Sequence, residues 1–570
     1  MFKGHPKGLV VAFLTNMGER FGFYTMMGIL VYFLQAKYGL GGTNAGYIYS
    51  AFYFSIYGLS IMGGIIADYL TRKGKRGLGQ TIFIGIIIML LGYVVMAIPI
   101  ADKKTFGLVI TIIGLFVIAF GNGLFKGNLQ AMVGNLYESP KYAHLRDRAF
   151  SIFYMGINVG AFFAPNAARG IRTWYLRQQG YKYDMELPEL CNNFLDGETV
   201  DMDKFQDLAD TVSGIHVTEL AQFSNNYIDA FSTGYHYAFG IAGVAMLVSL
   251  VVYLFFRGQL KAGDLIIKKG DETIDADKTG GATVVEDLTK EQSKQRFVAM
   301  ILVMVVVMFF WMSFHQNGLT LSMFARDYVI KEVGPVTFML FDIYALLSVI
   351  GVIIGIVLLI RKASELTTRL IGLAMIVGFG YLSYYFYTGF GEHNQIEPET
   401  FQHFNPIFIV FLTPVIVVFF AWLHRMKREP STPRKIGIGM ILTAVAFVVM
   451  IIGSQGIITP DLISTSGDYT RVSPYWLIDT YLILTIAELF LSPMGISFFS
   501  KVAPPKFKGL AQGMWLGATA IGNLFLFVGT LLWDNVGSLW HVWAVFTIIC
   551  IISASFIFGV MKRLERAAES

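Results

Sequence analysis

The stretch TNMGERFGFY, residues 15–24, places Glu19 and Arg20 side by side in the middle of the first long apolar segment of the chain. An ionisable residue at the centre of a membrane helix costs about 2.5 to 3.5 kcal/mol, so such residues face a bundle interior and find partners there. The stretch therefore predicts a membrane helix that forms one wall of a polar cavity, and the other walls are to be sought among the remaining apolar segments.

The composition indicates a polytopic membrane protein. Of the 570 residues, 55% are hydrophobic and only 15% are charged, and 59 are glycine. The net charge of +5 says little, because in membrane proteins the location of Lys and Arg matters more than their sum. Cys191 and Cys550 lie in different environments and have no metal-ligand spacing, so redox and metal chemistry are not expected.

Fourteen runs are long and apolar enough to cross about 30 Å of hydrocarbon. They cover residues 8–37, 44–70, 78–100, 106–134, 148–170, 231–256, 296–324, 337–360, 366–389, 403–424, 435–453, 474–500, 508–533 and 537–561. A polar linker, 257–295, follows the sixth run. We therefore expect an all-α protein with an N-terminal unit over 1–256 and a C-terminal unit over 296–570.

The distribution of basic residues predicts the orientation. If all fourteen runs cross, the basic loops, such as 72–76 and 425–435, fall on one side together with both termini, and short basic loops are retained in the cytoplasm. The acidic loop 171–229 falls on the opposite side. We interpret it as an extracytoplasmic cap, with a ligand-collecting domain as the alternative.

Three further polar residues stand inside apolar runs. Lys126 lies among glycines in residues 121–128, His315 follows Phe314 in the seventh run, and Glu488 begins ELFLSP in the twelfth. A lysine near a helix end can snorkel to the interface, but about ten apolar or small residues separate Lys126 from the charged loop. Glu488 lies roughly 21 Å along its helix from the run's start. We expect Lys126 and Glu488 to face the cavity.

Motifs for other functions are missing from the sequence. Neither a P-loop nor a dinucleotide-binding glycine fingerprint is present, so an ion gradient is the expected energy source. Without a zinc-protease motif or a nucleophile elbow, the chain is not expected to be an enzyme. No cofactor, metal or nucleic-acid partner is expected, and the oligomeric state is expected to be a monomer or weak dimer.

Several segments resemble the proton-coupled oligopeptide transporter family of the major facilitator superfamily. The most specific is RDRAFSIFYMGINVGA, 146–161, which is close to the family's fifth-helix signature. Further matches, in the family's order, are ERFGFY at 19–24, GGIIAD at 63–68 with Arg72, Lys126, FQHFNP at 401–406, the segment 488–495 and Trp515. The resemblance implies two six-helix bundles around a cavity that opens alternately to either side, carrying di- and tripeptides inward with protons across a bacterial inner membrane.

The resemblance also implies roles for single residues. The carboxylate of a peptide would meet Arg20 and Lys126, and its ammonium would meet Glu488 and Asn405. The remaining wall residues are expected to be Phe23, Tyr24, Asn158 and Trp515. Glu19, His315 and Glu488 are the candidates for proton coupling, and Asp68 and Arg72 are expected to act in gating.

The chain departs from the family pattern at three titratable or charged positions. Asn16 and His315 replace two of the usual carboxylates, and Met27 replaces an arginine. Two interpretations of His315 are open. In the first it binds the proton and its charge repels Lys126; in the second it is a neutral, hydrogen-bonded residue, and transport is driven through Glu19 or Glu488 or is merely facilitative.

A second departure is an extra pair of runs within 337–389, which we interpret as a peripheral helix hairpin inserted after the seventh helix. It contacts lipid or a second copy in this interpretation. Two functional alternatives remain for the whole chain. The first is a transporter of the same fold for another small solute, such as an amino-acid conjugate or an anion, and the second is a non-transporting membrane sensor.

Overall fold

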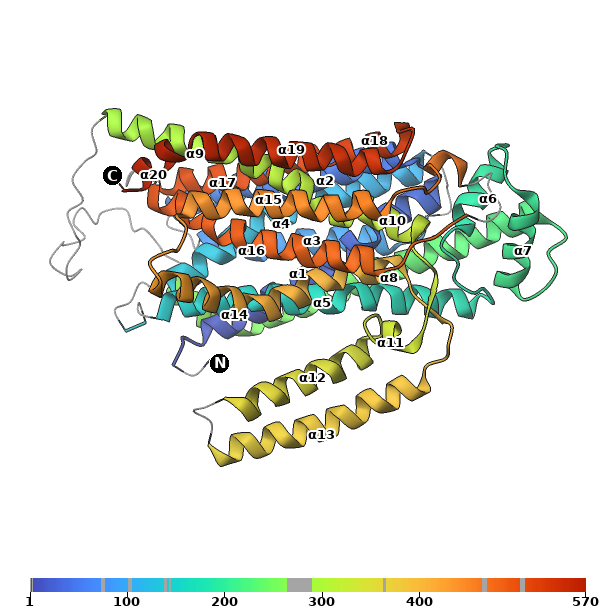
Figure 1. Cartoon of the computed structure of the whole chain (residues 1–570), viewed down its shortest axis with the longest axis horizontal. Coiled ribbons are helices and arrows are strands. Elements are labelled where there is room, and N and C mark those ends of the chain that lie inside the picture. Colours follow the sequence, from blue (N-terminus) through green and yellow to red (C-terminus); the bar gives the residue numbers. More distant parts are fainter. Residues whose placement is uncertain are drawn as a thin grey trace.

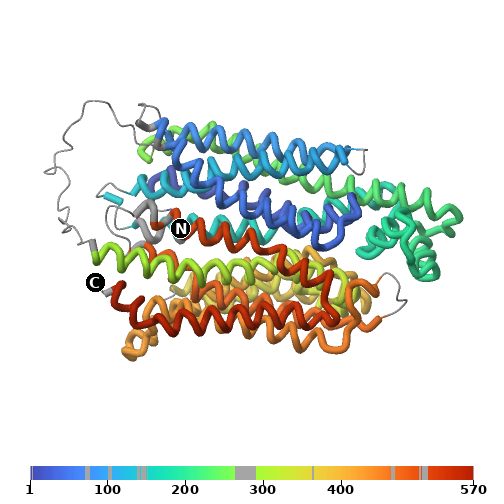
Figure 2. The backbone as a smooth tube through the Cα atoms, turned by 90° about the horizontal axis from the view of Figure 1, so that it is seen from above, coloured from blue at the N-terminus to red at the C-terminus, as the bar shows by residue number. Residues whose placement is uncertain are grey.

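The computed structural model describes residues 2, 4–72, 77–100, 105–137, 141–142, 145–263, 290–361, 365–463, 469–502 and 508–569. The helices before and after residue 263 form two groups that lie side by side (Figure 2). Each group has its own hydrophobic core, one built almost entirely from residues between Leu9 and Leu260, the other from residues between Ala299 and Ala567. We call these groups the first and second halves.

The first half contains eight α-helices and a short 3-10 helix within the described residues. They are α1 (Gly8–Tyr38), α2 (Gly42–Arg72), α3 (Gly77–Ala97), α4 (Phe106–Asn135), α5 (Arg146–Gln178), α6 (Leu187–Leu195), α7 (Met202–Ser213), α8 (Leu220–Phe256) and η2 (Arg257–Gly263). Glycines bring α3 and α4 close together, because a Cβ at Gly85 would lie 2.8 Å from the Gly121 carbonyl oxygen and one at Gly121 equally close to that of Gly85.

The second half begins after the linker, of which residues 264–289 lie outside the described part. Its elements are α9 (Lys290–Phe314), η3 (His315–Gly318), α10 (Thr320–Tyr328), β1 (Glu332–Val333), α11 (Pro335–Phe338), α12 (Ile343–Ile360), α13 (Leu366–Gly389), β2 (Asn394–Gln395), η4 (Pro398–His403), α14 (Phe404–Arg425), α15 (Thr432–Gly453), η5 (Pro460–Leu462), α16 (Tyr475–Val502), α17 (Lys508–Leu524), α18 (Phe527–Asn535), α19 (Trp540–Gly559) and α20 (Met561–Glu569).

Among the described residues, twelve helical segments are long and apolar enough to cross a membrane. The long helices α1 and α5 are not among these twelve. Both carry several charges, with Glu19, Arg20 and Lys37 on α1. The number of these segments makes the chain an all-helical, multi-pass membrane protein. Helices suit lipid because each one satisfies its own backbone hydrogen bonds.

Both chain termini lie at one end of the molecule, and α6 and α7 lie at the other (Figure 1). The predicted loop 171–229 is shorter than expected, because α5 continues to Gln178 and α8 already begins at Leu220. Hydropathy locates the end of the apolar run, whereas the helix itself continues for as long as its backbone hydrogen bonds do. We call the end with α6 and α7 the α6–α7 end.

Helices α12 and α13 lie beside each other at the edge of the molecule (Figure 1), and Leu346 near the start of α12 packs against Phe162 of α5 and Ile407 of α14. Strands β1 and β2 join the two ends of this pair in antiparallel register, Glu332 opposite Gln395. A Cβ on Gly355 would lie 2.8 Å from the Gly372 carbonyl oxygen, so small residues allow the close packing. Gly372 is the one fully buried residue of α13, and most of its other residues are exposed.

Two helices are interrupted at the same level of the second half. Helix α9 gives way to η3 at His315, and α17 ends at Leu524 before α18 begins. Gln316 donates from Nε2 to the carbonyl oxygen of Leu526 over 3.0 Å, and the same oxygen accepts from the backbone amide of Gly529 over 3.0 Å. The hydrogen bond from Gln316 links the two breaks and holds η3, which begins at His315, in place.

Candidate functional site

Glu19 and Arg20 form a closed pair in the middle of α1. Arg20 donates from Nε to Oε2 and from Nη2 to Oε1 of Glu19, each over 2.6 Å, and both residues are buried. Asn122 on α4 donates from Nδ2 to Oε1 of Glu19 over 2.6 Å. Because a bidentate ion pair orients and satisfies both partners, Glu19 holds Arg20 in this conformation.

Lys126 lies one helical turn after Asn122 on α4. Its ammonium rests over the ring of Tyr57 on α2, 4.1 Å from the ring centre, and the residue is half-buried. Among the described residues no carboxylate forms an ion pair with Lys126. A cation–π contact is worth about 0.5 to 2 kcal/mol, so the ammonium remains available to an anionic group.

Aromatic rings on α1 and α2 connect the two cationic residues. Tyr57 stacks with Tyr53 at 6.0 Å between ring centres, and Tyr53 meets Phe23 edge to face at 6.0 Å. Phe23 also contacts Tyr24 at 5.2 Å and lies 4.5 Å beneath the guanidinium of Arg20. Phe23 and Tyr24 thus lie beside Arg20, and Phe23 is linked through Tyr53 to the ring under Lys126.

Glu488 on α16 is the carboxylate of the second half at this level. It accepts a hydrogen bond from Nδ2 of Asn405 on α14 over 3.1 Å, and the same amide donates to Oγ1 of Thr485 over 3.0 Å. Within the described part of the chain, no cation pairs with Glu488. Lys126 and Glu488 thus lie on helices of different halves, and each lacks an ion-pair partner among the described residues.

His315 contacts both halves. Its Nδ1 and Oδ1 of Asn523 on α17 are 2.6 Å apart, its ring stacks on Trp311 at 4.7 Å, and Tyr53 of the first half lies at 4.6 Å. With the amide oxygen as acceptor, Nδ1 carries the hydrogen, an assignment made from the hydrogen-bond partner. Among the described residues no carboxylate contacts this imidazole, so a neutral ring satisfies the geometry.

The remaining predicted site residues have contacts of their own or lie outside the described residues. Trp515 is buried against Phe499 of α16, with ring centres 5.8 Å apart. The Asn158 side chain donates to a carbonyl of its own helix over 3.3 Å. The side chains of Asp68 and Arg72 lie outside the described part of the structure.

A buried ion-pair cluster joins the halves near the α6–α7 end. Arg172 on α5 is fully buried and donates to Glu399 from Nη1 and to Glu397 from Nη2. Arg169 approaches Glu397 over 3.1 Å, and the ring of Tyr183 lies 3.8 Å from the Arg172 guanidinium carbon. Two carboxylates of the second half are thereby neutralised by two arginines of the first.

Glu186, just before α6, is the centre of a second set of cross-half contacts. Arg471 and Lys331, the latter at 3.5 Å, pair with Glu186 from the second half, and Lys331 also pairs with Asp184 at 3.0 Å. Lys204 of the first half pairs with Glu186 at 3.3 Å. Burial, with a contribution from the nearby ammonium of Lys331, lowers the pKa of Lys204. These contacts attach the segment between α5 and α8 to the second half.

Every hydrogen bond or ion pair that joins two described residues of different halves lies toward the α6–α7 end. The residues of the first half involved are Tyr32, Gln35, Thr43, Asn166, Arg169, Arg172, Tyr183, Asp184, Glu186, Glu189 and Tyr235. The halves are thus bonded together at one end, and the central charges lie outside that bonded region.

Sequence reasoning missed both Asn122 and Tyr57, the partners of Glu19 and Lys126. A signal for Asn122 was available, because Asn122 and Lys126 are four residues apart and share a helix face. No local pattern pairs Arg172 with Glu397 and Glu399, which lie more than 200 positions later in the chain.

Comparisons with known proteins agree with this architecture. The family model described as PTR2, the POT family, matches residues 79–269 and 388–537. The peptide transporter YePEPT of Yersinia enterocolitica is 28% identical over 550 residues, covering 92% of this chain and 87% of that protein. A di-/tripeptide transporter of Lactococcus lactis subsp. cremoris is 27% identical over 547 residues, covering 90% and 87%.

Solved structures share the fold. A peptide transporter POT crystallised with alafosfalin has a TM-score of 0.66 at 22% identity and covers 100% of this chain and 97% of its own. A POT family transporter crystallised with 5-aminolevulinic acid has a TM-score of 0.65 at 20% identity, covering 99% and 98%. With a family model that matches more than half of its residues, this chain belongs to the POT family of membrane transporters, and it is not an enzyme.

Proposed function

We propose that this protein imports di- and tripeptides by alternating access, driven by the proton gradient. The observation that carries the proposal is the presence of two charges without an ion-pair partner among the described residues, Lys126 on α4 of the first half and Glu488 on α16 of the second. A short peptide is a zwitterion and carries the two complementary charges. The names of the related transporters support the same solute class.

In this proposal the peptide lies between the halves, with its carboxylate on Lys126 and its ammonium on Glu488 and Asn405. Charge-assisted hydrogen bonds are about twice as strong as neutral ones, so the two ends of the backbone provide most of the affinity. Phe23 and Tyr24 offer aromatic surface to the side chains. Asn158 and Trp515 are proposed to line or support the same space.

We assign the proton to Glu19. In the empty protein Glu19 neutralises Arg20. A proton on this carboxylate removes its charge, and Arg20 is then released to bind the peptide carboxylate beside Lys126. Proton and peptide binding thus favour each other, as symport requires. His315 is neutral in this scheme, because its protonation would place another cation near Lys126 with no carboxylate in contact among the described residues.

For the membrane arrangement we propose fourteen crossings, the twelve apolar segments together with α1 and α5. Residues 1–256 and 296–570 form the two bundles that move against each other, and α12 with α13 forms an added peripheral hairpin within 337–389. The basic loops support cytoplasmic termini in a bacterial inner membrane. The α6–α7 end is then extracytoplasmic and closed, with Asp68 and Arg72 in the cytoplasmic gating region.

The test is transport by purified protein in proteoliposomes. Radiolabelled dialanine is expected to accumulate against its gradient when the lumen is made alkaline, and unlabelled dialanine is expected to exchange with it under counterflow. Counterflow without accumulation would contradict proton coupling. The absence of both, with free amino acids or organic anions transported instead, would overturn the solute class.

A further inference from the structure

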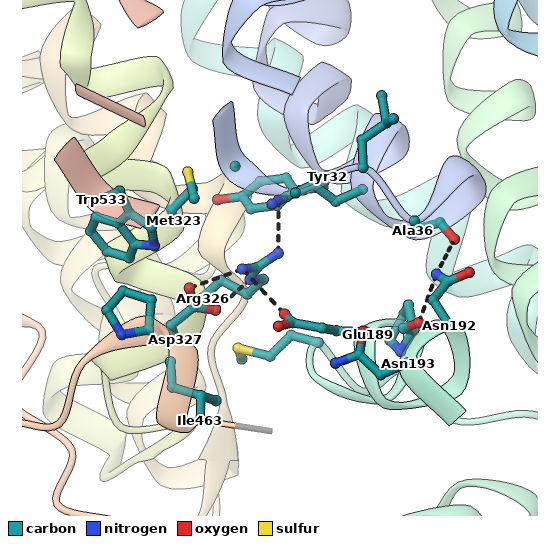
Figure 3. Close-up of a pocket in the computed structure, with 18 of the residues that line it drawn as sticks. Tyr32, Ala36, Glu189, Asn192, Asn193, Met323, Arg326, Asp327, Ile463 and Trp533 are labelled. Atoms are coloured by element: carbon teal, nitrogen blue, oxygen red, sulfur yellow. Dashed lines mark hydrogen bonds and ion pairs between the residues drawn. The ribbon is translucent and has the colours of Figure 1, made fainter. Parts of the chain in front are cut away.

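A cavity of about 400 Å³ lies between the halves at the α6–α7 end (Figure 3). Its floor is the pair Arg326–Asp327 on α10, and both residues are more than nine-tenths buried. Tyr32 on α1 and Glu189 on α6 form walls from the first half, and Trp533 on α18 forms a wall from the second. Ligand cavities commonly have about 300 to 1,000 Å³, so this space suits a small solute.

The guanidinium on the floor is already occupied by protein partners. Arg326 donates from Nε and Nη2 to the Asp327 carboxylate and from Nη1 to Oε1 of Gln35 over 2.8 Å. Its Nη2 also pairs with Glu189 at 3.5 Å. A free anion would therefore have to displace these carboxylates, so the cavity does not select for anions.

The cavity walls carry an excess of negative charge. Five carboxylates line it, against Arg326 as the sole basic side chain among the described lining residues; they are Glu189, Glu198, Asp327, Asp461 and Asp534. Glu198, Asp461 and Asp534 are solvent-exposed. A narrow space lined by one sign of charge concentrates counter-ions, so the rim attracts cations toward the buried floor.

Aromatic rings add a second feature that favours cations. Tyr32, Tyr183, Tyr235 and Trp533 line the cavity together with the carboxylates. Aromatic faces attract ammonium groups by about 0.5 to 2 kcal/mol. The described residues contain no group of three or more His, Cys, Asp or Glu side chains arranged to hold a metal ion, so an organic ammonium fits the cavity better than a metal.

We propose that this cavity is a second binding site, separate from Lys126 and Glu488, for a small solute that carries a protonated amine. It rests on the proposed function in one respect: the α6–α7 end is the entry side, and the amine belongs to an incoming peptide. Cationic peptides bind here most strongly, because a basic side chain adds a second positive charge.

The contacts around Arg326 also explain how the site connects to transport. Arg326 belongs to the second half, whereas Glu189 and Gln35 belong to the first. Opening the halves at this end breaks both contacts. Glu189 then loses a cationic partner, and an ammonium group that has entered the cavity replaces it.

The test measures binding of lysyl-lysine by calorimetry to the full-length protein in detergent at low salt. The Lys126→Ala/Glu488→Gln variant removes the central charges. It is expected to retain lysyl-lysine binding while losing dialanine binding. Adding Asp461→Asn and Asp534→Asn is expected to weaken lysyl-lysine binding about tenfold. Asp203→Asn, an exposed acidic residue of α7 outside the cavity lining, is the matched control and is expected to change nothing.

Loss of lysyl-lysine binding in the central variant would overturn the second site, and so would unchanged affinity in the cavity variant. Thermal unfolding of each variant checks that it is folded. The two proposals fail separately. Wild-type protein that binds lysyl-lysine in a manner sensitive to Asp461 and Asp534, yet transports no peptide, would refute the transport function and retain the cavity as an amine site.

Discussion

The charges at the centre of the molecule and those at the α6–α7 end are arranged in opposite ways. At the end, Arg172 is enclosed by Glu397 and Glu399 from the other half. At the centre, Lys126 and Glu488 have no partner of opposite charge among the described residues. A buried charge without a partner is costly. Paired charges therefore hold a conformation, and unpaired charges mark where a ligand is to supply the missing partners.

The largest effect is expected from breaking a pair. Arg172→Met leaves the buried Glu399 without its arginine and Glu397 with Arg169 alone, and removing one partner of a buried ion pair costs about 3 to 5 kcal/mol. Thermal unfolding in detergent is expected to show this loss. Neutralising the carboxylates as well, with Glu397→Gln and Glu399→Gln, is expected to restore most of the stability. Arg177→Met, on the exposed end of the same helix, is the control, and an equal loss there would contradict the comparison.

Removing an unpaired charge is expected to affect function and spare stability. Lys126→Ala and Glu488→Gln each remove one charged hydrogen-bonding group for the ligand, worth about 1.5 to 3 kcal/mol. Dialanine counterflow is expected to fall about 10- to 100-fold. The thermal midpoint is expected to stay or rise, because a desolvated charge has been removed. A large drop in stability would show that these charges are structural.

Glu19→Gln separates coupling from binding. The variant mimics a protonated Glu19 and releases Arg20 permanently. Counterflow of dialanine is expected to persist, whereas accumulation driven by a pH gradient is expected to disappear. Accumulation that survives in Glu19→Gln would remove Glu19 as the proton carrier.

Loosening the α6–α7 end is expected to have a smaller effect. Glu186→Gln weakens the two ion pairs that join Glu186 to Arg471 and Lys331 of the second half, and so favours opening at this end. Labelling of Met323→Cys in the cavity by an impermeant maleimide added to intact cells is expected to become about three- to tenfold faster, equivalent to about 1 kcal/mol. Asp203→Asn is again the control, and equal labelling rates would mean that Glu186 does not hold this end closed.

The smallest effect is expected at His315. Because its imidazole satisfies its hydrogen bond to Asn523 while neutral, His315→Gln is expected to leave pH-driven uptake within about twofold of wild type. Proton-driven uptake that fails in this variant while counterflow remains would revive the alternative in which His315 binds the proton.

The helices were predictable because each membrane crossing corresponds to one continuous apolar run in the sequence. The run 366–389 coincides with α13, and Gly8–Tyr38 lies within one residue of the run 8–37. The predicted and observed boundaries differ where a helix continues beyond its apolar run, as α5 does up to Gln178. Charged residues inside these runs, such as Glu19, Lys126 and Glu488, were visible for the same reason.

Pairing was not predictable, because it depends on which helices meet. The amino-acid sequence already places Glu19 beside Arg20, but only the packing of α1 against α4 shows that Asn122 binds the same carboxylate and that Lys126 has no ion-pair partner among the described residues. Likewise, Glu189 in the loop and Arg326 on α10 become walls of one cavity only after the two halves are packed together. Charged groups interact strongly only within a few ångströms of each other. The order of residues in the sequence does not show which groups 100 or more positions apart come that close.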